Sequence, residues 1–257
     1  MNILEKIIID KKSEIARRKK DTPIDLANIK VRKQKNLFSE ALKKKGISLI
    51  AEIKRKSPSA GIIREDFDHL AIAKTYEKNG AAAISVLTDS KYFGGKLSFI
   101  SDIKSKFNIP VLRKEFIIDE YQIYESLIAG ADAILLIVKA LKPKELKKFI
   151  MISNELGLET LVEVHSSDEL DIALETGSSI IGINNRNLDT MKVNLETSLK
   201  LIEKIPKNYI KVSESGIHAY DDIKLLRNAG FDVFLIGESL MREKNPGKKL
   251  KSLRGEG

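Results

Sequence analysis

The sequence predicts an α/β fold, a (β/α)8 or TIM barrel preceded by a helical extension of about 47 residues. From residue 48 onward, short runs rich in Ile, Val, Leu and Ala alternate with amphipathic stretches of helical period. The apolar runs show no alternation with polar residues, which is typical of parallel strands covered by helices on their outer face. There are eight such runs, the number of strands in a closed barrel of this kind.

Each strand is expected where an apolar run lies between turn residues. The eight runs are 48–54, 82–88, 111–116, 133–138, 160–164, 180–184, 210–214 and 233–237. Amphipathic helices are expected at 70–79, 121–129, 143–156, 167–175, 195–204 and 220–228. Several of these end near a glycine suited to a left-handed cap: Gly80, Gly130, Gly157, Gly177 and Gly230.

A repeated unit and the lack of a linker indicate one domain over residues 1–257. The segments 129–134 and 229–234 read almost alike, as joints of a repeated βα unit would. Residues 1–47 form the extension, with helical patterns at 4–20 and 37–45 that either fill the barrel floor or cap its mouth. An open doubly wound sheet is the alternative fold, but its usual Gly-rich dinucleotide turn is absent.

Composition excludes several classes of site. The 257 residues include no Cys and only three His, which excludes disulfides, thiolate metal sites and a histidine-rich metal cluster. No run approaches the ~20 apolar residues needed to cross a bilayer, and charges interrupt the start before it resembles a signal peptide. We therefore expect a cytoplasmic protein that does not engage the membrane.

The net charge of +9 favours anionic partners in general. Arg17 to Lys20 is the most basic run, but other basic residues stand among acidic ones, as Glu196 and Lys200 do, which is typical of a solvated helix face. No aromatic interleaving or nucleic-acid motif accompanies these runs. A small anionic ligand is therefore favoured over nucleic acid.

Polar residues stand at the carboxyl ends of five expected strands, the face that carries active sites in barrels of this kind. These residues are Glu52, Lys54, Lys114, Glu163, Asn184, Arg186 and Glu214. A charge buried without a partner costs several kcal/mol, so these groups should meet one another or a charged ligand. A structural ion-pair layer or simple solvation at the rim is the alternative.

Two further features suggest what such a ligand contains. Gly216 and Gly237 follow the last two strands, where backbone amides bind phosphate in this fold. The basic loop 54–61 is either a mobile solvated segment or a lid over an anionic substrate. Four apolar residues near the rim would together accept a flat ring: Phe93, Phe116, Leu135 and Leu188.

In combination, these motifs resemble the indole-3-glycerol phosphate synthase family from about residue 48 to 242. The matching segments are 50–59 (IAEIKRKSPS), 112–117 (LRKEFI), 161–165 (LVEVH), 182–188 (GINNRNL) and 213–216 (SESG). The resemblance implies a carbon–carbon lyase of tryptophan biosynthesis. Its members convert 1-(2-carboxyphenylamino)-1-deoxyribulose 5-phosphate into indole-3-glycerol phosphate, carbon dioxide and water, with no metal or organic cofactor.

The resemblance also implies roles for the residues. Lys114 is the acid for ring closure; Glu163 or Lys54 is the acid for dehydration, with Glu52 as base or as the group that orients Lys114. Asn184 and Arg186 hold substrate or carboxylates, Glu214 positions lysines, and Ser215 binds substrate. The phosphate contacts are Ser57, Gly216, Gly237, Glu238 through its backbone, and Ser239. The chain has no Trp, so any aromatic that relatives supply from the first helix is replaced here by an aliphatic residue such as Leu4 or Ile8, or by nothing.

Two other functions remain open at this point. One is another phosphate-binding barrel enzyme, such as phosphoribosylanthranilate isomerase, although that chemistry relies on a Cys that this chain lacks. The other is a non-catalytic barrel that binds nucleic acid. We expect a monomer whose partner is a phosphorylated, carboxylated arylamino sugar.

Overall fold

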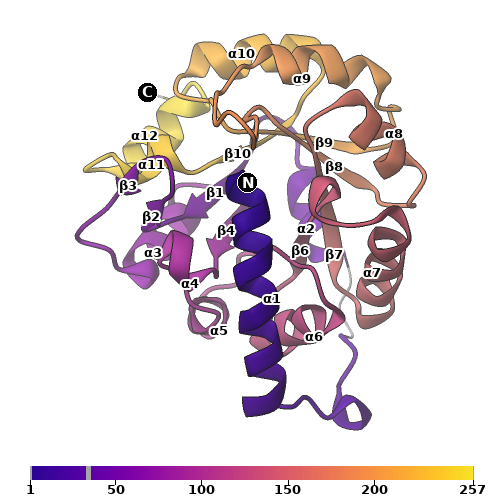
Figure 1. The fold of residues 1–257 in the computed structure, drawn as a ribbon. Helices are drawn as coiled ribbons and strands as arrows, with labels where there is room; N and C mark the ends of the chain where they lie inside the picture. The colour runs from indigo at the N-terminus through magenta and orange to yellow at the C-terminus, as the bar shows by residue number, and fades with distance from the viewer. Residues whose placement is uncertain (1, 33–35, 257) are drawn as a thin grey trace.

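Eight parallel strands form a closed barrel in the computed structural model, which describes residues 2–32 and 36–256 (Figure 1). Neighbours around the barrel follow the order β1-β10-β9-β8-β7-β6-β5-β4. The strands are β1 (Ser48–Ile53), β4 (Ala83–Leu87), β5 (Val111–Lys114), β6 (Ala133–Ile137), β7 (Glu159–Val164), β8 (Ile180–Asn184), β9 (Ile210–Glu214) and β10 (Val233–Ile236). This confirms the predicted barrel.

Helices surround the barrel and connect its strands. They are α1 (Ile3–Asp21), α2 (Leu37–Leu42), α3 (His69–Lys78), α4 (Ser90–Phe93), α5 (Ser98–Lys104), α6 (Glu120–Ala129), α7 (Pro143–Leu156), α8 (Ser167–Leu174), α9 (Glu196–Leu201), α10 (Tyr220–Ala229), α11 (Glu238–Met241) and α12 (Pro246–Leu253). Short 3-10 turns are η1 (Leu26–Asn28), η2 (Val138–Ala140) and η3 (Ile202–Lys204). In the described part of the chain, no helix is both long and apolar enough to span a membrane.

The differences from the sequence prediction lie in short elements. The segment expected as one helix at 195–204 divides into α9 and η3. Helices α4, α5, α11 and α12 were not predicted, nor was the hairpin of β2 (Lys56–Ser57) and β3 (Gly61–Ile62) inside the basic loop after β1. Two-residue strands and four-residue helices such as α4 and α11 are too short to show a period. Helices α5 and α12, with seven and eight residues, make only about two turns, which gives a weak periodic signal.

The two similar joints 129–134 and 229–234 have the same local structure. Gly130 and Gly230 both adopt the left-handed conformation, with φ of 88° and 111°, at the caps of α6 and α10. In each, the glycine amide donates to a carbonyl in the last turn of the helix. The chain then turns directly into the next strand, which is how one βα unit is followed by another.

Alternate residues of each strand pack into two separate cores. Ile50, Leu112, Leu161 and Val212 point into the barrel, whereas neighbours such as Leu49 pack outward against the helices. Both sets are almost wholly buried. The continuous hydrophobicity of the strands therefore follows from burial on both faces.

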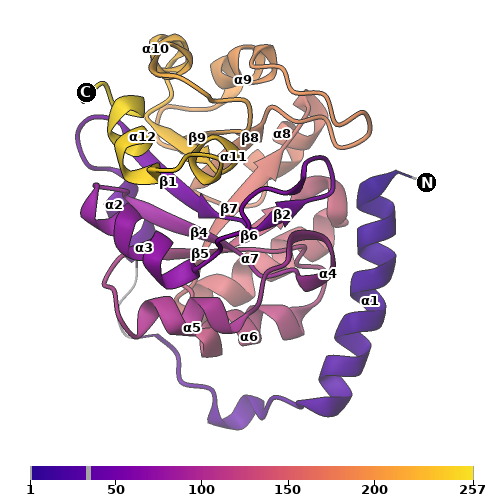
Figure 2. The same cartoon turned by 90° about the vertical axis from the view of Figure 1, so that its left-hand side faces the viewer.

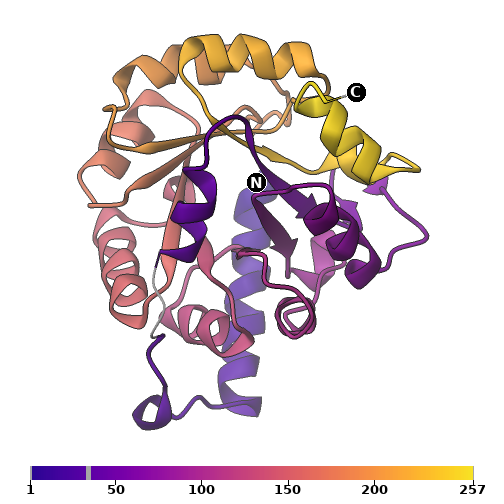
Figure 3. The ribbon, with the colours of Figure 1, turned by 180° about the vertical axis from the view of Figure 1, so that it is seen from behind.

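The extension reaches both ends of the barrel. Figure 2 shows α1 and α2 at opposite ends, and Figure 3 shows α2 from behind. Phe38 and Leu42 of α2 join the core inside the barrel at its floor, while the Phe38 amide donates to Glu159 at the start of β7. At the other end, Leu4 and Ile7 of α1 line the mouth. The two alternatives for the extension are both correct, each for one helix.

A buried lysine holds α1 against the barrel. Lys11 is only 1% exposed, and its Nζ lies 2.8 Å from Asp89 and 3.1 Å from Glu115, which follow β4 and β5. Glu14 of the same helix makes a third contact at 2.8 Å. Burial alone would lower the pKa of Lys11, but Glu115 and Asp89 raise it well above its usual value. Lys11 therefore remains charged and ties the extension to the residue that follows Lys114.

We predict that Lys11→Met lowers the free energy of unfolding by about 3 kcal/mol, because two buried carboxylates lose their cation. Urea unfolding followed by circular dichroism measures the change. The matched control is Lys12→Met, one residue along on the exposed side of α1, where we expect a change below about 0.5 kcal/mol. Equal losses in the two variants would show that these ion pairs do not hold α1.

Candidate active site

One cavity opens at the carboxyl ends of the strands, and all seventeen residues singled out from the sequence line it. Those from strands or their immediate ends are Glu52, Lys54, Lys114, Phe116, Leu135, Glu163, Asn184, Arg186, Glu214, Ser215, Gly216 and Gly237. Those from loops and helix starts are Ser57, Phe93, Leu188, Glu238 and Ser239. Residues up to 187 positions apart in the sequence therefore meet at one mouth, as the alignment of parallel strand ends requires.

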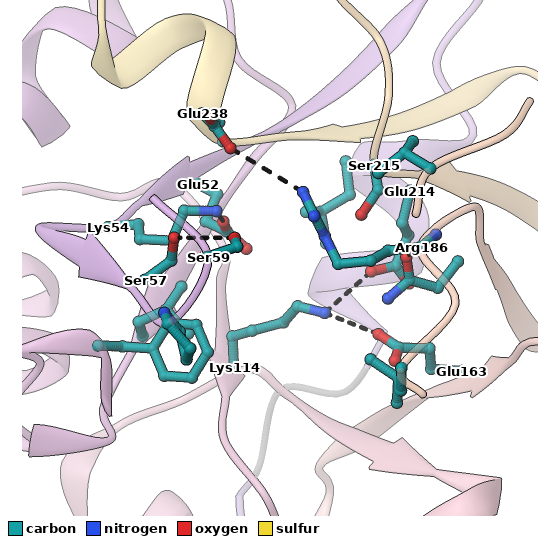
Figure 4. Close-up of a pocket in the computed structure, with 18 of the residues that line it drawn as sticks. Glu52, Lys54, Ser57, Ser59, Lys114, Glu163, Arg186, Glu214, Ser215 and Glu238 are labelled. Carbon is teal, nitrogen blue, oxygen red and sulfur yellow. Dashed lines mark hydrogen bonds and ion pairs between the residues drawn. The ribbon is translucent and has the colours of Figure 1, made fainter. Parts of the chain in front are cut away.

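Lys114 lies at the centre of this cavity between two carboxylates (Figure 4). Its Nζ is 2.8 Å from Glu163 Oε2 and 2.9 Å from Glu214 Oε2, and it donates to both. The three side chains come from β5, β7 and β9. They lie inside the barrel because strand alternation places Glu163 on the same face as Leu161, and Glu214 on the same face as Val212.

The pKa values of this trio are shifted in different directions. Burial alone would lower the pKa of Lys114, but Glu163 and Glu214 raise it above its usual range. Burial alone would raise the pKa of Glu163, but Lys114 and His165 lower it. For Glu214, burial and the charge of Glu163 outweigh Lys114 and raise the pKa to about 7. The trio thus holds a firmly charged lysine, a firmly ionised Glu163 and a carboxyl that exchanges its proton near neutral pH.

A second lysine–carboxylate pair lies across the cavity. Lys54 Nζ is 2.7 Å from Glu52 Oε1, so Glu52 contacts Lys54 directly and not Lys114. Gly237 on the neighbouring strand end gives Glu52 its room, because a Cβ there would overlap Glu52 Oε1. The cavity therefore offers two ammonium groups, each with a carboxylate beside it.

Asn184 and Arg186 line the same cavity at the end of β8. Asn184 Oδ1 accepts a hydrogen bond from the Arg186 amide at 2.9 Å, which fixes the turn after β8. The Arg186 guanidinium lies 3.9 Å from the carboxylate of Glu238. Nη1 of Arg186 donates a hydrogen bond to the Met191 carbonyl. Arg186 is thus placed at the rim, where a loosely held cation is open to an anionic ligand.

The ends of β1, β10 and β9 form a polar, glycine-rich side of the mouth. These three strands are neighbours in the barrel, so the loops carrying Ser57, Gly237 and Gly216 are adjacent. Ser215 and Gly216 both have positive φ, 65° and 79°, which turns the backbone sharply at the strand exit. Glu238 and Ser239 begin α11, so their amides have no acceptor within the helix.

The opposite side of the mouth is apolar. Phe93 after α4 and Phe116 after β5 contact each other with ring centroids 6.1 Å apart and an angle of 37°. Ile3, Leu4 and Ile7 of α1 cover them from above. Of the two residues expected from the first helix, Leu4 lines the cavity and Ile8 does not. Ile7 lines it instead, since positions three apart on a helix share a face.

Other residues near the mouth were not identified from the sequence. Met191, Val193 and His218 also line the cavity. Lys139, to which the sequence assigns no role, pairs with Asp189 at 2.5 Å outside the cavity lining. The described residues contain no group of three or more His, Asp or Glu arranged to hold a metal ion.

Comparison with known proteins gives one consistent family. The family described as Indole-3-glycerol phosphate synthase matches residues 4–253. An indole-3-glycerol phosphate synthase of Campylobacter jejuni subsp. doylei is 46% identical over 256 residues, covering 98% of this chain and 99% of the relative. Another, of Caldanaerobacter subterraneus subsp. tengcongensis, is 50% identical over 241 residues, covering 93% of each chain.

Among solved structures, 3-hexulose-6-phosphate synthase from Salmonella typhimurium superposes with a TM-score of 0.66 over 82% of this chain and 98% of that chain. At 14% identity, that likeness concerns the fold alone. The family match over residues 4–253 and the identities of 46% to 50% show more than the fold, because they extend over nearly the whole chain. This chain belongs to the indole-3-glycerol phosphate synthase family.

Proposed function

We propose that this protein is a carboxy-lyase that converts 1-(2-carboxyphenylamino)-1-deoxyribulose 5-phosphate into indole-3-glycerol phosphate in tryptophan biosynthesis. The observation that carries the proposal is the position of Lys114, a charged ammonium group held 2.8 and 2.9 Å from two buried carboxylates. The cavity around it has a polar glycine-rich side and an apolar aromatic side. A substrate with a phosphate at one end and an aryl ring at the other matches this division.

Phosphate binding is assigned to the side formed by β1, β10 and β9. The free amides at Glu238 and Ser239, and the backbone at Gly216 and Gly237, which no side chain covers, suit phosphate oxygens. Ser57 adds a hydroxyl from the hairpin of β2 and β3, which closes over the same side. The aryl ring then extends between Phe93, Phe116, Leu135 and Leu188.

Ring closure begins when the aryl carbon attacks the ketone and negative charge develops on the ketone oxygen. Lys114 supplies a proton to that oxygen, because it is the charged acid at the centre of the cavity. Loss of carbon dioxide from the same aryl carbon restores aromaticity. The hydroxyl formed from the ketone then leaves as water after taking a second proton.

Dehydration requires an acid that protonates the departing hydroxyl and a base that removes a proton from the adjacent nitrogen or carbon. Glu163 is held as an anion by Lys114 and His165 and has no proton to give, so we assign the acid to Lys54. Glu52, which lies 2.7 Å from the Lys54 ammonium, takes the proton that leaves the neighbouring nitrogen or carbon. Two protons go to the departing oxygen and one comes off the ring, so each turnover takes up one proton.

The remaining expectations concern partners and location. A non-catalytic nucleic-acid role is disfavoured because two residues of the basic run are used internally: Arg18 pairs with Glu125 at 2.7 Å and Lys19 with Asp119 at 2.8 Å. We propose a monomer that works in the cytoplasm with no cofactor and no nucleic-acid partner. Binding to a random oligonucleotide that persists above physiological salt would contradict this.

We predict that the purified protein turns over the carboxyphenylamino substrate with a rise in indole fluorescence, and that Lys114→Ala lowers kcat by about 10² to 10⁴ with the fold intact. Lys114→Arg should be nearly as inactive, since a guanidinium hardly gives up a proton. Lys148→Ala is the matched control, because this lysine is 52% exposed and pairs with Glu120 on the outside of the barrel. Near-normal turnover by Lys114→Ala would remove Lys114 from its role.

We predict that Gly182→Ala lowers kcat by about 10²-fold, because a Cβ on β8 would overlap Glu214 Oε1 and displace the carboxylate from Lys114. Steady-state kinetics measures the loss. A double-mutant cycle provides the control: in a Glu214→Ala background the side chain has room, so adding Gly182→Ala should cause little further loss. Additive losses in the cycle would mean that Gly182 acts through something other than Glu214.

A further inference from the structure

His165 lies directly behind Glu163 but outside the cavity lining. It follows β7, and its ring Nε2 is 3.2 Å from Glu163 Oε1, while Lys114 binds the other carboxylate oxygen, Oε2. The two oxygens of Glu163 thus face two different cations. The His165 side chain is 8% exposed, so water does not replace this contact.

Glu169 holds His165 from the other side. Its Oε2 lies 3.1 Å from His165 Nδ1 and also accepts the His165 backbone amide at 2.8 Å. Glu169 itself is fixed in the first turn of α8, where its amide donates to the capping residue Ser166. Glu169, His165 and Glu163 therefore form a continuous chain of contacts, and Glu163 in turn contacts Lys114.

The surrounding charges favour a protonated imidazole. Burial alone would lower the pKa of His165, but Glu163 and Glu169 raise it to about 9. Beyond Glu163, the facing groups are Lys114 and Glu214; at the loop after β8 Asp189 also faces His165, and it is paired with Lys139. The nearest groups to His165 are thus two carboxylates, and both stabilise its charge.

Glu214 has the opposite surroundings. Its Oε2 contacts Lys114, but within the described chain its buried Oε1 has no hydrogen-bond partner and no cation beside it. The two oxygens of Glu163 lie 2.8 Å from Lys114 Nζ and 3.2 Å from His165 Nε2, the second contact being an ion pair that is not aligned as a hydrogen bond. Of the two carboxylates around Lys114, one is therefore stabilised as an anion by two cations and the other by one. A proton shared by this pair belongs on Glu214.

We infer that His165, oriented by Glu169, is a positioning residue for the reaction: it keeps Glu163 ionised beside Lys114 and so makes Glu214 the carboxyl that takes up and returns the proton. This rests on the proposed function, in which each turnover consumes one proton. After Lys114 Nζ–H transfers its proton to the ketone oxygen, the lysine is recharged by the O–H of Glu214, 2.9 Å away, which is then reprotonated from solvent. No step places His165 in contact with the substrate.

The first test is the pH profile of kcat/KM for His165→Gln, which keeps a side-chain donor and removes only the charge. Glu214 must carry its proton in order to reprotonate Lys114, so its ionisation sets the alkaline limb of the profile. Removing a cation lets carboxyls hold their protons to higher pH, so this limb should move up by about one pH unit. On the alkaline limb of the wild type, kcat/KM of the variant should therefore exceed that of the wild type by up to about tenfold, with KM within about twofold. Glu169→Gln should move the limb in the same direction by less.

His69→Asn is the matched control. His69 is also paired with an acid, 3.0 Å from Asp102, but it lies on α3 outside the cavity, so its replacement should leave the profile unchanged. An active wild type whose profile does not move in His165→Gln overturns this inference alone. A wild type without turnover overturns the proposed function instead.

The second test needs no activity. The chain has only three histidines, so NMR of the ligand-free protein labelled at histidine resolves them, and the signal missing in His165→Gln belongs to His165. We expect that signal to titrate near pH 9 in the wild type and about one unit lower in Glu169→Gln. A midpoint at or below 6.5 would show that Glu163 has no cation behind it and would overturn the inference.

Discussion

The structure depends on one constraint, the cost of holding charge inside a closed barrel. Lys114, Glu163 and Glu214 are all at least partly shielded from water, and an isolated charge there would cost several kcal/mol. Each is therefore satisfied by the others at distances below 3 Å. Because Glu163 stays ionised beside it, Lys114 retains its proton until a strong acceptor, such as a developing alkoxide, comes within reach.

The same constraint explains features that have no direct part in the reaction. Gly182 leaves space for the carboxylate of Glu214, and Gly237 leaves space for that of Glu52. A Cβ at either position would overlap the carboxylate oxygen. Lys11 neutralises Asp89 and Glu115, which follow β4 and β5, and holds α1 at the mouth. The ion pairs of Lys11 therefore also position the apolar residues of α1, which cover the aromatic side of the cavity.

The sequence predicts the barrel and the contents of the mouth for a physical reason. Apolar runs buried on both faces identify the strands, and parallel strands bring their carboxyl ends together, so Lys114 and Glu163 must converge once the strands are assigned. Lys11 could not be found this way. In a basic amphipathic helix it looks like any solvated lysine, and its partners lie 78 and 104 residues away in the sequence.

His165 was not identified from the sequence, although this residue lies only two positions after Glu163. Glu163, His165 and Glu169 are close in the chain, within seven positions of one another. What cannot be predicted is which oxygen of Glu163 each cation faces, because that depends on Lys114 arriving from another strand. The distinction matters, since a net uptake of one proton per turnover requires a group that changes charge near neutral pH. Glu163, which lies between the two cations Lys114 and His165, stays ionised and cannot be this group. Glu214, which contacts only Lys114 of the two, can take up and release the proton.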